Sequence, residues 1–406
     1  MSQGVRPGYK RTEVGVIPED WEIRPCSEVS ERIMVGIVIR PTQYYVPHGV
    51  PAFRSANIRE DGITDSDLVY ISDSSNALLA KSQTRTGDIL TVRTGYPGTS
   101  AVVHPTHAGC NCIDILITRP SKKVAPDFLA IWVNSSFGKE QVLRNQGGLA
   151  QKHFNVGDMR NLLLALPPPP EQRAIAAALS DVDALLGGLE RLIAKKRDLK
   201  QAAMQQLLTG QTRLPGFSGE WEVKRLGEIC DIAMGRTPPR LNSAMWGDGH
   251  VWLSIADLKG KVVSDSKEQI TALAAASMSV IQKGTLLMSF KLSIGRLCFA
   301  GCDLFTNEAI CSFNNPQANS EYLYYALGRT DFSLYGKQAV KGYTLNKESL
   351  KSVEVSIPPP PEQTAIAAIL SDIDAELATL EARRDKTRAL KQAMMQELLT
   401  GRIRLI

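Results

Sequence analysis

The sequence predicts an α+β protein in which two globular domains alternate with two long helices, giving the chain a pseudo-twofold organisation. Two observations predict this fold class. The 48 residues 167–214 return 191 positions later without a gap, and 32 of these positions are identical. The region before each copy mixes short strand-like and helix-like runs, which is typical of an α+β globule. We therefore expect globular domains at 1–166 and 215–357, followed by helices at 167–214 and 358–406.

The two globular regions share a skeleton although their loops differ. Each opens with Trp-Glu and an apolar residue, and continues through a Gly-marked loop, two strand-like runs and a polar loop containing basic residues and glycine. In the first region these features are Trp21–Ile23, the loop from Gly36, the runs 51–58 and 86–90, and the loop 93–100. In the second region they are Trp221–Val223, Gly235–Pro239, 251–258, 283–287 and 291–296. Short helices are expected at 126–144 and 319–335. Because function usually lies in loops on a scaffold, two different sets of loops indicate two different recognition surfaces.

Each repeated segment predicts one helix of roughly 35–40 residues. Four prolines form a stiff extended start, and the last of them, Pro170 or Pro361, suits the first helical position. Gly210 and Gly401 stand where a helix C-terminal glycine belongs. Apolar residues recur at alternating steps of four and three, which is the seam of a coiled coil. The seam residues are Ile175, Leu179, Val182, Leu186, Leu189 and Ile193 in copy one and Ile366, Leu370, Ile373, Leu377 and Leu380 in copy two.

The two helices are expected to pack against each other as an antiparallel coiled coil. Such packing explains why both copies keep a seam, which copy two interrupts at Arg384. The copies also agree at positions expected to face solvent, namely Lys195/Lys386, Lys200/Lys391 and Gln201/Gln392. Binding the same partner twice would explain these matched outer positions.

Composition restricts the classes of protein to consider. The net charge of +5 is small for a non-specific nucleic-acid binder, so any DNA binding must come from local placement of charge or be shared with a partner. No apolar run is long enough for a membrane span, and the N-terminus lacks the apolar core of a signal peptide. We therefore expect a cytoplasmic protein without a membrane partner.

The seven cysteines do not form the pattern of a disulfide framework, and we expect them to be reduced and mostly buried. His104, His107, Cys110 and Cys112 are residue types that bind zinc. They lie between two strand-like runs without a matching second pair, so no metal site is predicted.

The chain lacks the motifs of the common catalytic sites. There is no GxxxxGK[ST] phosphate loop, no HExxH and no GxSxG. The repeated carboxylates Asp181/Asp183 and Asp372/Asp374 are two residues apart on a helix and so do not face each other. We interpret them as solvated helix charges and expect no catalytic residues in this chain.

The layout resembles the specificity subunit of Type I restriction–modification systems over the whole chain. The most specific part is the doubled block of an apolar residue, Pro-Pro-Pro-x-Glu-Gln-x-x-Ile-Ala and a long helix ending Gln-x-Leu-Leu-Thr-Gly, at 166–210 and 357–401. The resemblance implies two target recognition domains that bind double-stranded DNA, joined by a helical spacer. It also implies docking of two methyltransferase (modification) subunits and, optionally, two restriction (motor/nuclease) subunits. The cofactors S-adenosylmethionine, ATP and magnesium would belong to those partners, and none to this chain.

Base recognition in a DNA groove requires side chains that reach base edges, chiefly Arg, Lys, Asn and Gln. The candidate residues are Arg93, Tyr96, Gln151, Lys152, His153 and Asn155 in the first domain and Lys291, Ser293, Arg296, Lys341, Tyr343 and Asn346 in the second. For each, a phosphate contact or a solvated loop residue is the alternative. Substitution of Arg93 by alanine would weaken recognition of the first half-site alone if Arg93 contacts a base, and recognition of every sequence equally if it contacts a phosphate.

Two other functions remain open at this point. A coiled-coil adaptor that joins two identical partners without DNA would agree with the near-neutral charge. A stand-alone nuclease would cut DNA in the presence of a metal, although its motifs are absent. The preferred hypothesis is a subunit that reads a split, asymmetric DNA target, with the helices setting the length of the unread gap between half-sites.

Overall fold

The computed structural model describes residues 6–144, 153–291, 293–339 and 342–405. The chain forms two compact units. Unit 1 comprises residues 1–190 and 382–406, whereas unit 2 comprises residues 191–381. Each unit therefore contains one globular domain together with one half of each long helix, so both helices are divided between the units.

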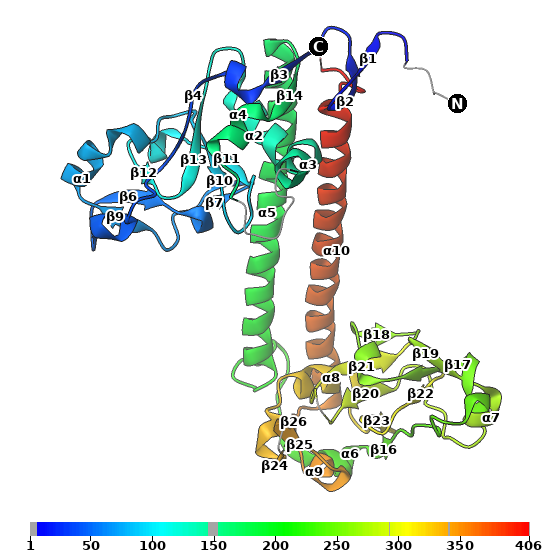
Figure 1. Cartoon of the computed structure of the whole chain (residues 1–406). Coiled ribbons are helices and arrows are strands. Elements are labelled where there is room, and N and C mark those ends of the chain that lie inside the picture. The colour runs from blue at the N-terminus through cyan, green and yellow to red at the C-terminus, as the bar shows by residue number, and fades with distance from the viewer. Residues whose placement is uncertain (1–5, 145–152, 292, 340–341, 406) are drawn as a thin grey trace. The chain divides into compact units, whose positions relative to one another are not determined.

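The globular part of unit 1 is built on two four-stranded sheets (Figure 1). The first, in the order β11-β10-β13-β4, consists of Ser100–Val102, Ile89–Val92, Ile115–Pro120 and Ser30–Val35. The second, in the order β12-β6-β9-β5, consists of Asn111–Cys112, Val50–Phe53, Val69–Ile71 and Tyr45–Val46. Shorter antiparallel pairs are formed by β1 (Tyr9–Thr12) with β2 (Gly15–Pro18), β3 (Glu22–Pro25) with β14 (Leu163–Leu166), and β7 (Ile58–Arg59) with β8 (Gly62–Ile63).

The helices of the globular part of unit 1 are α1 (Asp73–Leu78), α2 (Pro126–Asn134), α3 (Ser136–Arg144) and α4 (Val156–Asn161). Strand β10 is buried at all four positions because it has apolar neighbours on both faces. Ile89 belongs to the core that includes α2 and the start of the first long helix, whereas Leu90 and Val92 belong to the core between the two sheets. This division follows from the alternation of side chains along a strand.

Unit 2 repeats this plan with different strand lengths. A five-stranded sheet, β16-β23-β20-β21-β18, consists of Asp231–Met234, Ile310–Asn314, Leu286–Ser289, Leu297–Ala300 and Val262–Val263. A three-stranded sheet, β19-β17-β22, consists of Glu268–Ile270, Trp246–Leu253 and Phe305–Thr306. Further pairs are β15 (Glu222–Arg225) with β26 (Glu354–Ile357) and β24 (Lys337–Ala339) with β25 (Gly342–Thr344). The short helices are α6 (Leu226–Ile229), α7 (Ala272–Ala275), α8 (Ser320–Gly328) and α9 (Lys347–Lys351).

The two repeated segments form helices of 39 residues each, α5 (Pro169–Leu207) and α10 (Pro360–Leu398), which confirms the predicted length. Each begins one proline earlier than predicted, and each ends before a glycine with positive φ, Gly210 or Gly401. In unit 1, residues 169–190 of α5 lie beside the C-terminal part of α10, and in unit 2 the C-terminal part of α5 lies beside the N-terminal part of α10 (Figure 1).

Ion pairs between the helices show that the paired segments are antiparallel. In unit 1, Asp183 binds Lys391 at 2.6 Å and Glu190 binds Arg388 at 2.9 Å. From Asp183 to Glu190 the chain runs forward along α5, whereas their partners run backward along α10 from Lys391 to Arg388, so the two segments point in opposite directions. Thus Lys391 is bound across the helix pair, where we expected a solvent-facing residue.

Unit 2 contains the equivalent ion pairs, shifted by the repeat offset. Asp374 binds Lys200, and Glu381 binds Arg197. The prediction that Lys200 and Lys391 face solvent, and that Asp183 and Asp374 are merely solvated, is therefore wrong, because all four side chains are half-buried in interhelical pairs. The other matched residues, Lys195/Lys386 and Gln201/Gln392, are exposed as expected.

The first residues of the predicted seam belong to the domain cores as well as to the helix pair. Each core contains two of them, Ile175 and Leu179 of α5 or Ile366 and Leu370 of α10, all fully buried together with leucines at the end of the other long helix. Farther along, the symmetry fails as expected at Arg384, whose guanidinium binds the neighbouring Asp385 where copy one has the buried Ile193.

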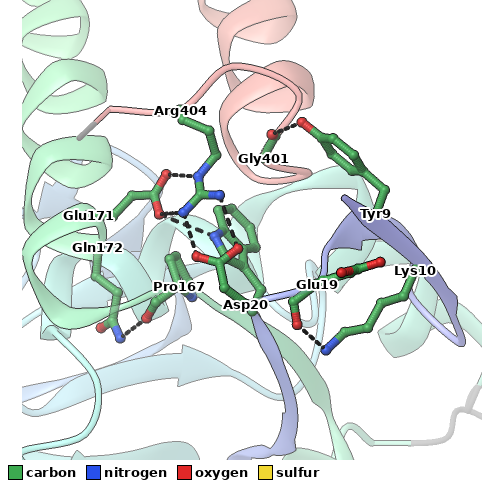
Figure 2. A network of polar contacts seen from close by, with 10 residues as sticks. Tyr9, Lys10, Glu19, Asp20, Pro167, Glu171, Gln172, Gly401 and Arg404 are labelled. Carbon is green, nitrogen blue, oxygen red and sulfur yellow. Dashed lines mark hydrogen bonds and ion pairs between the residues drawn. The ribbon is translucent and has the colours of Figure 1, made fainter. Parts of the chain in front are cut away.

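A buried glutamate at the start of each long helix joins three distant segments. In unit 1, Glu171 is 4 % exposed and accepts hydrogen bonds from Trp21 Nε1 at 3.1 Å and from Arg404 Nε at 2.6 Å (Figure 2). Arg404 also binds Asp20. Hydrogen bonding to Glu171, and then to Asp20, raises the pKa of Arg404, and the bond from Arg404 lowers the pKa of Asp20. The start of the domain, the start of α5 and the segment after α10 are thereby held together.

Unit 2 has the same arrangement at Glu362, which is fully buried. It accepts from Trp221 Nε1 at 3.1 Å and from Arg213 Nε at 2.6 Å. We call these two sites the Trp–Glu–Arg clusters. They explain why a tryptophan opens each globular region and why an arginine lies three residues after each helix-ending glycine.

The glutamine that follows each buried glutamate is also structural. Gln172 donates to the carbonyl of Pro167 and accepts from the backbone N–H of Ala125, just before α2 (Figure 2 shows the first of these bonds). Gln363 does the same with Pro358 and Asn319, just before α8. The repeated Glu-Gln pair thus fastens each helix to its globular domain.

All seven cysteines are free thiols, and six are buried, as predicted. Within the described residues, no group of three or more His, Cys, Asp or Glu side chains is placed to hold a metal ion. Among the helices of those same residues, none combines the length and apolar composition needed to cross a membrane.

Candidate nucleic-acid interface

The predicted basic loops occupy equivalent places in the two units. Each follows an inner strand of a sheet, β10 or β20, and turns back through a glycine with positive φ, +89° at Gly98 and +84° at Gly295. The N–H of Gly98 donates to Val92, and that of Gly295 donates to Ser289. The structural equivalent of Arg93 is Phe290, so the sequence pairing of Arg93 with Lys291 was displaced by one residue.

Arg93 is anchored within unit 1. Its guanidinium binds Asp114 and donates from Nε to the carbonyl of Phe154 at 3.3 Å, leaving the side chain 17 % exposed. Asp114 itself has a positive φ of 51°. The structure therefore places Arg93 as a link between loops, with only part of its guanidinium open to solvent.

A second segment lies beside each basic loop. The N–H of Phe154 donates to the carbonyl of Arg93, and in unit 2 the N–H of Leu345 donates to that of Phe290. Asn155 and Asn346 follow these residues and cap α4 and α9, because their side-chain oxygens accept backbone N–H groups. Both are exposed, but capping uses their acceptor oxygens.

A third loop, for which no site residues were predicted, completes the arrangement. In unit 1 it begins at Gly36, where an added Cβ would lie 2.3 Å from the Cys112 carbonyl oxygen. In unit 2 it begins at Gly235, where an added Cβ would lie 2.2 Å from Thr306 Oγ1. This close approach requires glycine, and it fixes the start of the third loop at the same point in both domains.

In both units the segment that follows β12 or β22 joins the third loop to the basic loop, although the contacts differ. In unit 1, the N–H of Asp114 donates to Ile37 of the third loop, and Asp114 also binds Arg93. In unit 2, Thr237 of the third loop donates to Glu308, and the N–H of Phe290 donates to the adjacent Ala309. We call residues 36–40, 93–98 and 153–155 loop cluster 1, and residues 235–242, 290–291, 293–296 and 345–346 loop cluster 2.

Positive charge in loop cluster 2 is partly neutralised. Hydrogen bonding from Thr237 holds the pKa of Glu308 below its ordinary value, and the charges of Lys291 and Arg240 act in the same direction. Arg240 lies 4.0 Å from the ring centre of Trp246 and binds Glu268 at 2.7 Å. This stack orients the guanidinium on an aromatic surface.

The predicted site residues differ in accessibility. Tyr96 is 84 % exposed, His153 and Arg296 are exposed, and Lys291 and Ser293 are half-buried. Tyr343 lies in β25, whereas Gln151, Lys152 and Lys341 lie outside the described residues. Sequence reasoning missed the exposed arginines of the third loop, Arg40, Arg236 and Arg240, although the glycine before each loop indicated a special backbone position.

Comparisons with known proteins agree with this architecture. The chain is 25% identical over 426 residues to the putative type I restriction enzyme MjaX specificity subunit of Methanocaldococcus jannaschii, covering 98% of this chain and 96% of the relative. It is 34% identical over 176 residues to the MjaIX specificity subunit of that organism, over 40% of each chain.

Solved structures share the fold at low sequence identity. The Type I restriction–modification S subunit from M. genitalium matches with a TM-score of 0.60 and 15% identity, over 93% of this chain and 96% of that one. A chain from a study of complex assembly and conformational transition in the type I R-M system matches with a TM-score of 0.58 and 21% identity, over 95% and 99%.

A family model matches the chain twice. It describes the Type I restriction modification DNA specificity domain and covers residues 18–196 and 218–387. Each match contains one globular domain and most of the helix that follows it. The chain therefore belongs to the Type I restriction–modification DNA specificity family and carries two copies of its domain.

Proposed function

We propose that this protein is the sequence-specific DNA-binding subunit of a Type I restriction–modification complex, in which each unit reads one half of a split, asymmetric target. One observation carries this proposal. Both units bring the same three loops together, and two of the loops are joined by an equivalent backbone hydrogen bond, Phe154 to Arg93 or Leu345 to Phe290, while the side chains on the loops differ. A common frame with different contact residues supports recognition of two different half-sites by one binding mode.

The proposal assigns no catalysis to this chain. Methylation would come from two modification subunits and ATP-dependent cleavage from two restriction subunits, which would hold S-adenosylmethionine, ATP and magnesium. The names of the relatives as specificity subunits support this division of labour. The exposed, matched residues Lys195/Lys386 and Gln201/Gln392 give one chain two similar helical surfaces for two copies of a partner.

The long helices are proposed to set the unread gap between half-sites. Antiparallel segments are held in register by interhelical ion pairs in each unit, such as Asp183 with Lys391 and Lys200 with Asp374. The Trp–Glu–Arg clusters fasten each globular domain to the helix ends. Each domain is therefore fixed to a helical support whose length is determined by the sequence.

The test is to coexpress the chain with the modification subunit encoded beside it and to map the modified bases in the host DNA. We expect the two proteins to copurify and to modify a target of two different half-sites with a constant gap. Replacing either half-site should abolish modification. If the two proteins copurify but do not change the electrophoretic mobility of DNA, the result favours a coiled-coil adaptor that does not bind DNA. Metal-dependent cutting of DNA by the purified chain alone would indicate a nuclease.

A further inference from the structure

We infer that Ile39 and Leu241 are specificity-determining residues that enter the DNA groove and contact base edges, one in each half-site. The inference rests on the proposed function and adds contacts that the charged loop residues do not supply. Ile39 belongs to loop cluster 1 and Leu241 to loop cluster 2. Both are apolar residues that the chain leaves in contact with water.

The two residues occupy the same structural position. Each lies in the third loop, between the glycine that begins the loop, Gly36 or Gly235, and a short 3-10 helix, Pro41–Tyr44 or Ser243–Met245. Each immediately precedes the N-cap residue of that helix, Arg40 or Asn242. The loops differ in sequence and length, yet both place a large aliphatic side chain at this point.

Their exposure is high for their residue types. Leu241 is 102 % exposed and Ile39 is 76 % exposed, so the described part of the chain leaves both side chains largely uncovered. Val38 beside Ile39 is 47 % exposed as well. Single exposed apolar residues are common on protein surfaces, but two at equivalent loop positions, each next to an arginine, indicate a shared partner surface.

The neighbouring charges identify DNA as that partner. Arg40 follows Ile39, and Arg240 precedes Leu241, so each aliphatic side chain has an exposed guanidinium beside it. The backbone of Arg40 has a positive φ of 42°, and Arg240 is held by the Trp246 stack and Glu268. Arginine beside an apolar side chain suits a DNA groove, where the cation binds phosphate and the apolar group meets thymine methyls or base faces.

The position of the third loop within each cluster supports base contact. Asp114 connects the loop of Ile39 to Arg93, and Glu308 connects the loop of Leu241 to the segment that follows β22. The apolar residues therefore lie on the same loop clusters as the residues predicted to read bases.

The experiment measures DNA binding by the complete complex with its modification subunits, using the mapped target. Ile39→Ser and Leu241→Ser should each reduce the affinity for DNA about tenfold, which is the loss that one mismatched base pair in the target causes. Ile39→Val and Leu241→Met should retain most of the affinity, since they keep an apolar group. The controls are Val16→Ser and Val223→Ser, exposed residues of β2 and β15 outside the loop clusters.

Targets with one half-site replaced assign each residue to its half. Ile39→Ser should cause no further loss on DNA whose first half-site is replaced, and Leu241→Ser none on DNA whose second is replaced. The inference is overturned if Ile39→Ser and Leu241→Ser bind DNA as well as the controls Val16→Ser and Val223→Ser. It is also overturned if they lose affinity equally on all DNA. If the wild-type complex binds no split target, the proposed function itself fails, and the two outcomes are thus distinguishable.

Discussion

Glu171 and Glu362 are buried charges that the structure fully partners. Each accepts an indole N–H and two guanidinium N–H groups, so its carboxylate is compensated by one arginine. A buried carboxylate that loses its cation is costly because the remaining charge cannot return to water. The arginine lies 233 residues from the glutamate in the first cluster and 149 in the second, so each cluster links segments that the sequence separates.

Arg404→Ala should therefore destabilise unit 1 strongly. We expect a loss of about 3 kcal/mol in the free energy of unfolding, because Glu171 remains buried and, among the described residues, keeps only Trp21 as a side-chain partner. Urea unfolding followed by tryptophan fluorescence measures it. Arg402→Ala is the matched control, since its pair with Glu397 is exposed, and it should cost less than about 1 kcal/mol. Equal losses for the two variants would contradict a stabilising role for the cluster.

The cysteines should be poorly reactive in the folded protein. Burial raises the pKa of Cys26 to about 11 and that of Cys230 and Cys298 to about 12. At pH 8 these thiols are protonated and shielded, whereas the thiolate is the reactive form. A chromogenic thiol reagent should label about one group rapidly, the half-buried Cys302, and all seven after denaturation. Rapid labelling of several thiols in the native protein would refute the burial.

At the scale of the element, α5 and α10 are held in register by charge as well as by apolar contact. Asp183–Lys391 in unit 1 and Lys200–Asp374 in unit 2 are equivalent under the repeat. The Lys196–Glu376 pair has no counterpart, because copy two has Thr387 and copy one has Leu185 at the matching positions. The paired segments are thus similar but not identical.

A double-mutant cycle tests the repeated ion pair. Asp183→Lys and Lys391→Asp should each destabilise the protein by about 1 kcal/mol, because each places like charges together, and combining them should restore most of the loss. Urea unfolding at low and high salt measures the coupling, which should weaken as salt screens the charges. Lys195→Asp, at an exposed lysine for which the described residues show no ion pair, is the control. Additive effects would mean that the pair is not coupled.

At the scale of the whole molecule, neither compact unit is a continuous half of the chain. Unit 1 is built from a domain, the start of α5 and the end of α10, and unit 2 from the end of α5, a domain and the start of α10. The two units therefore contain equivalent parts in circularly permuted order. A change in one long helix alters both units, so a change in helix length has to be made in both helices to preserve their pairing.

Inserting four helix-forming residues after Gly188 and four after the matching Thr379 should lengthen the unread gap in the target. Four residues add about 6 Å of helix, which corresponds to one or two base pairs. The half-site sequences should stay the same because the loop clusters are unchanged. Methylation mapping of the coexpressed complex measures the gap. Gly188→Ala with Thr379→Ala is the control without added length, and an unchanged gap in the insertion variant would exclude the helices as the spacer.

The amino-acid sequence by itself determined the features that depend on short-range pattern. Helix length, the seam and the closing glycines follow from local spacing, and the internal repeat exposed the two-domain plan. The shared skeleton of the domains was also predictable, because Gly36 and Gly235 precede loops that follow equivalent strands. These features are encoded within a few turns or a few strands of the chain.

Only the tertiary structure decided how distant segments combine. The contact of Glu171 with Arg404 spans 233 residues, and no local pattern specifies it. Lys200 and Lys391 were expected to face solvent because a helical periodicity does not show which charged residue meets a charge on the other helix. The anchoring of Arg93 by Asp114 and the exposure of Ile39 and Leu241 likewise depend on how loops pack around the sheets. Long-range contacts select among the surfaces that local sequence permits, and the candidate interface was therefore only partly predictable.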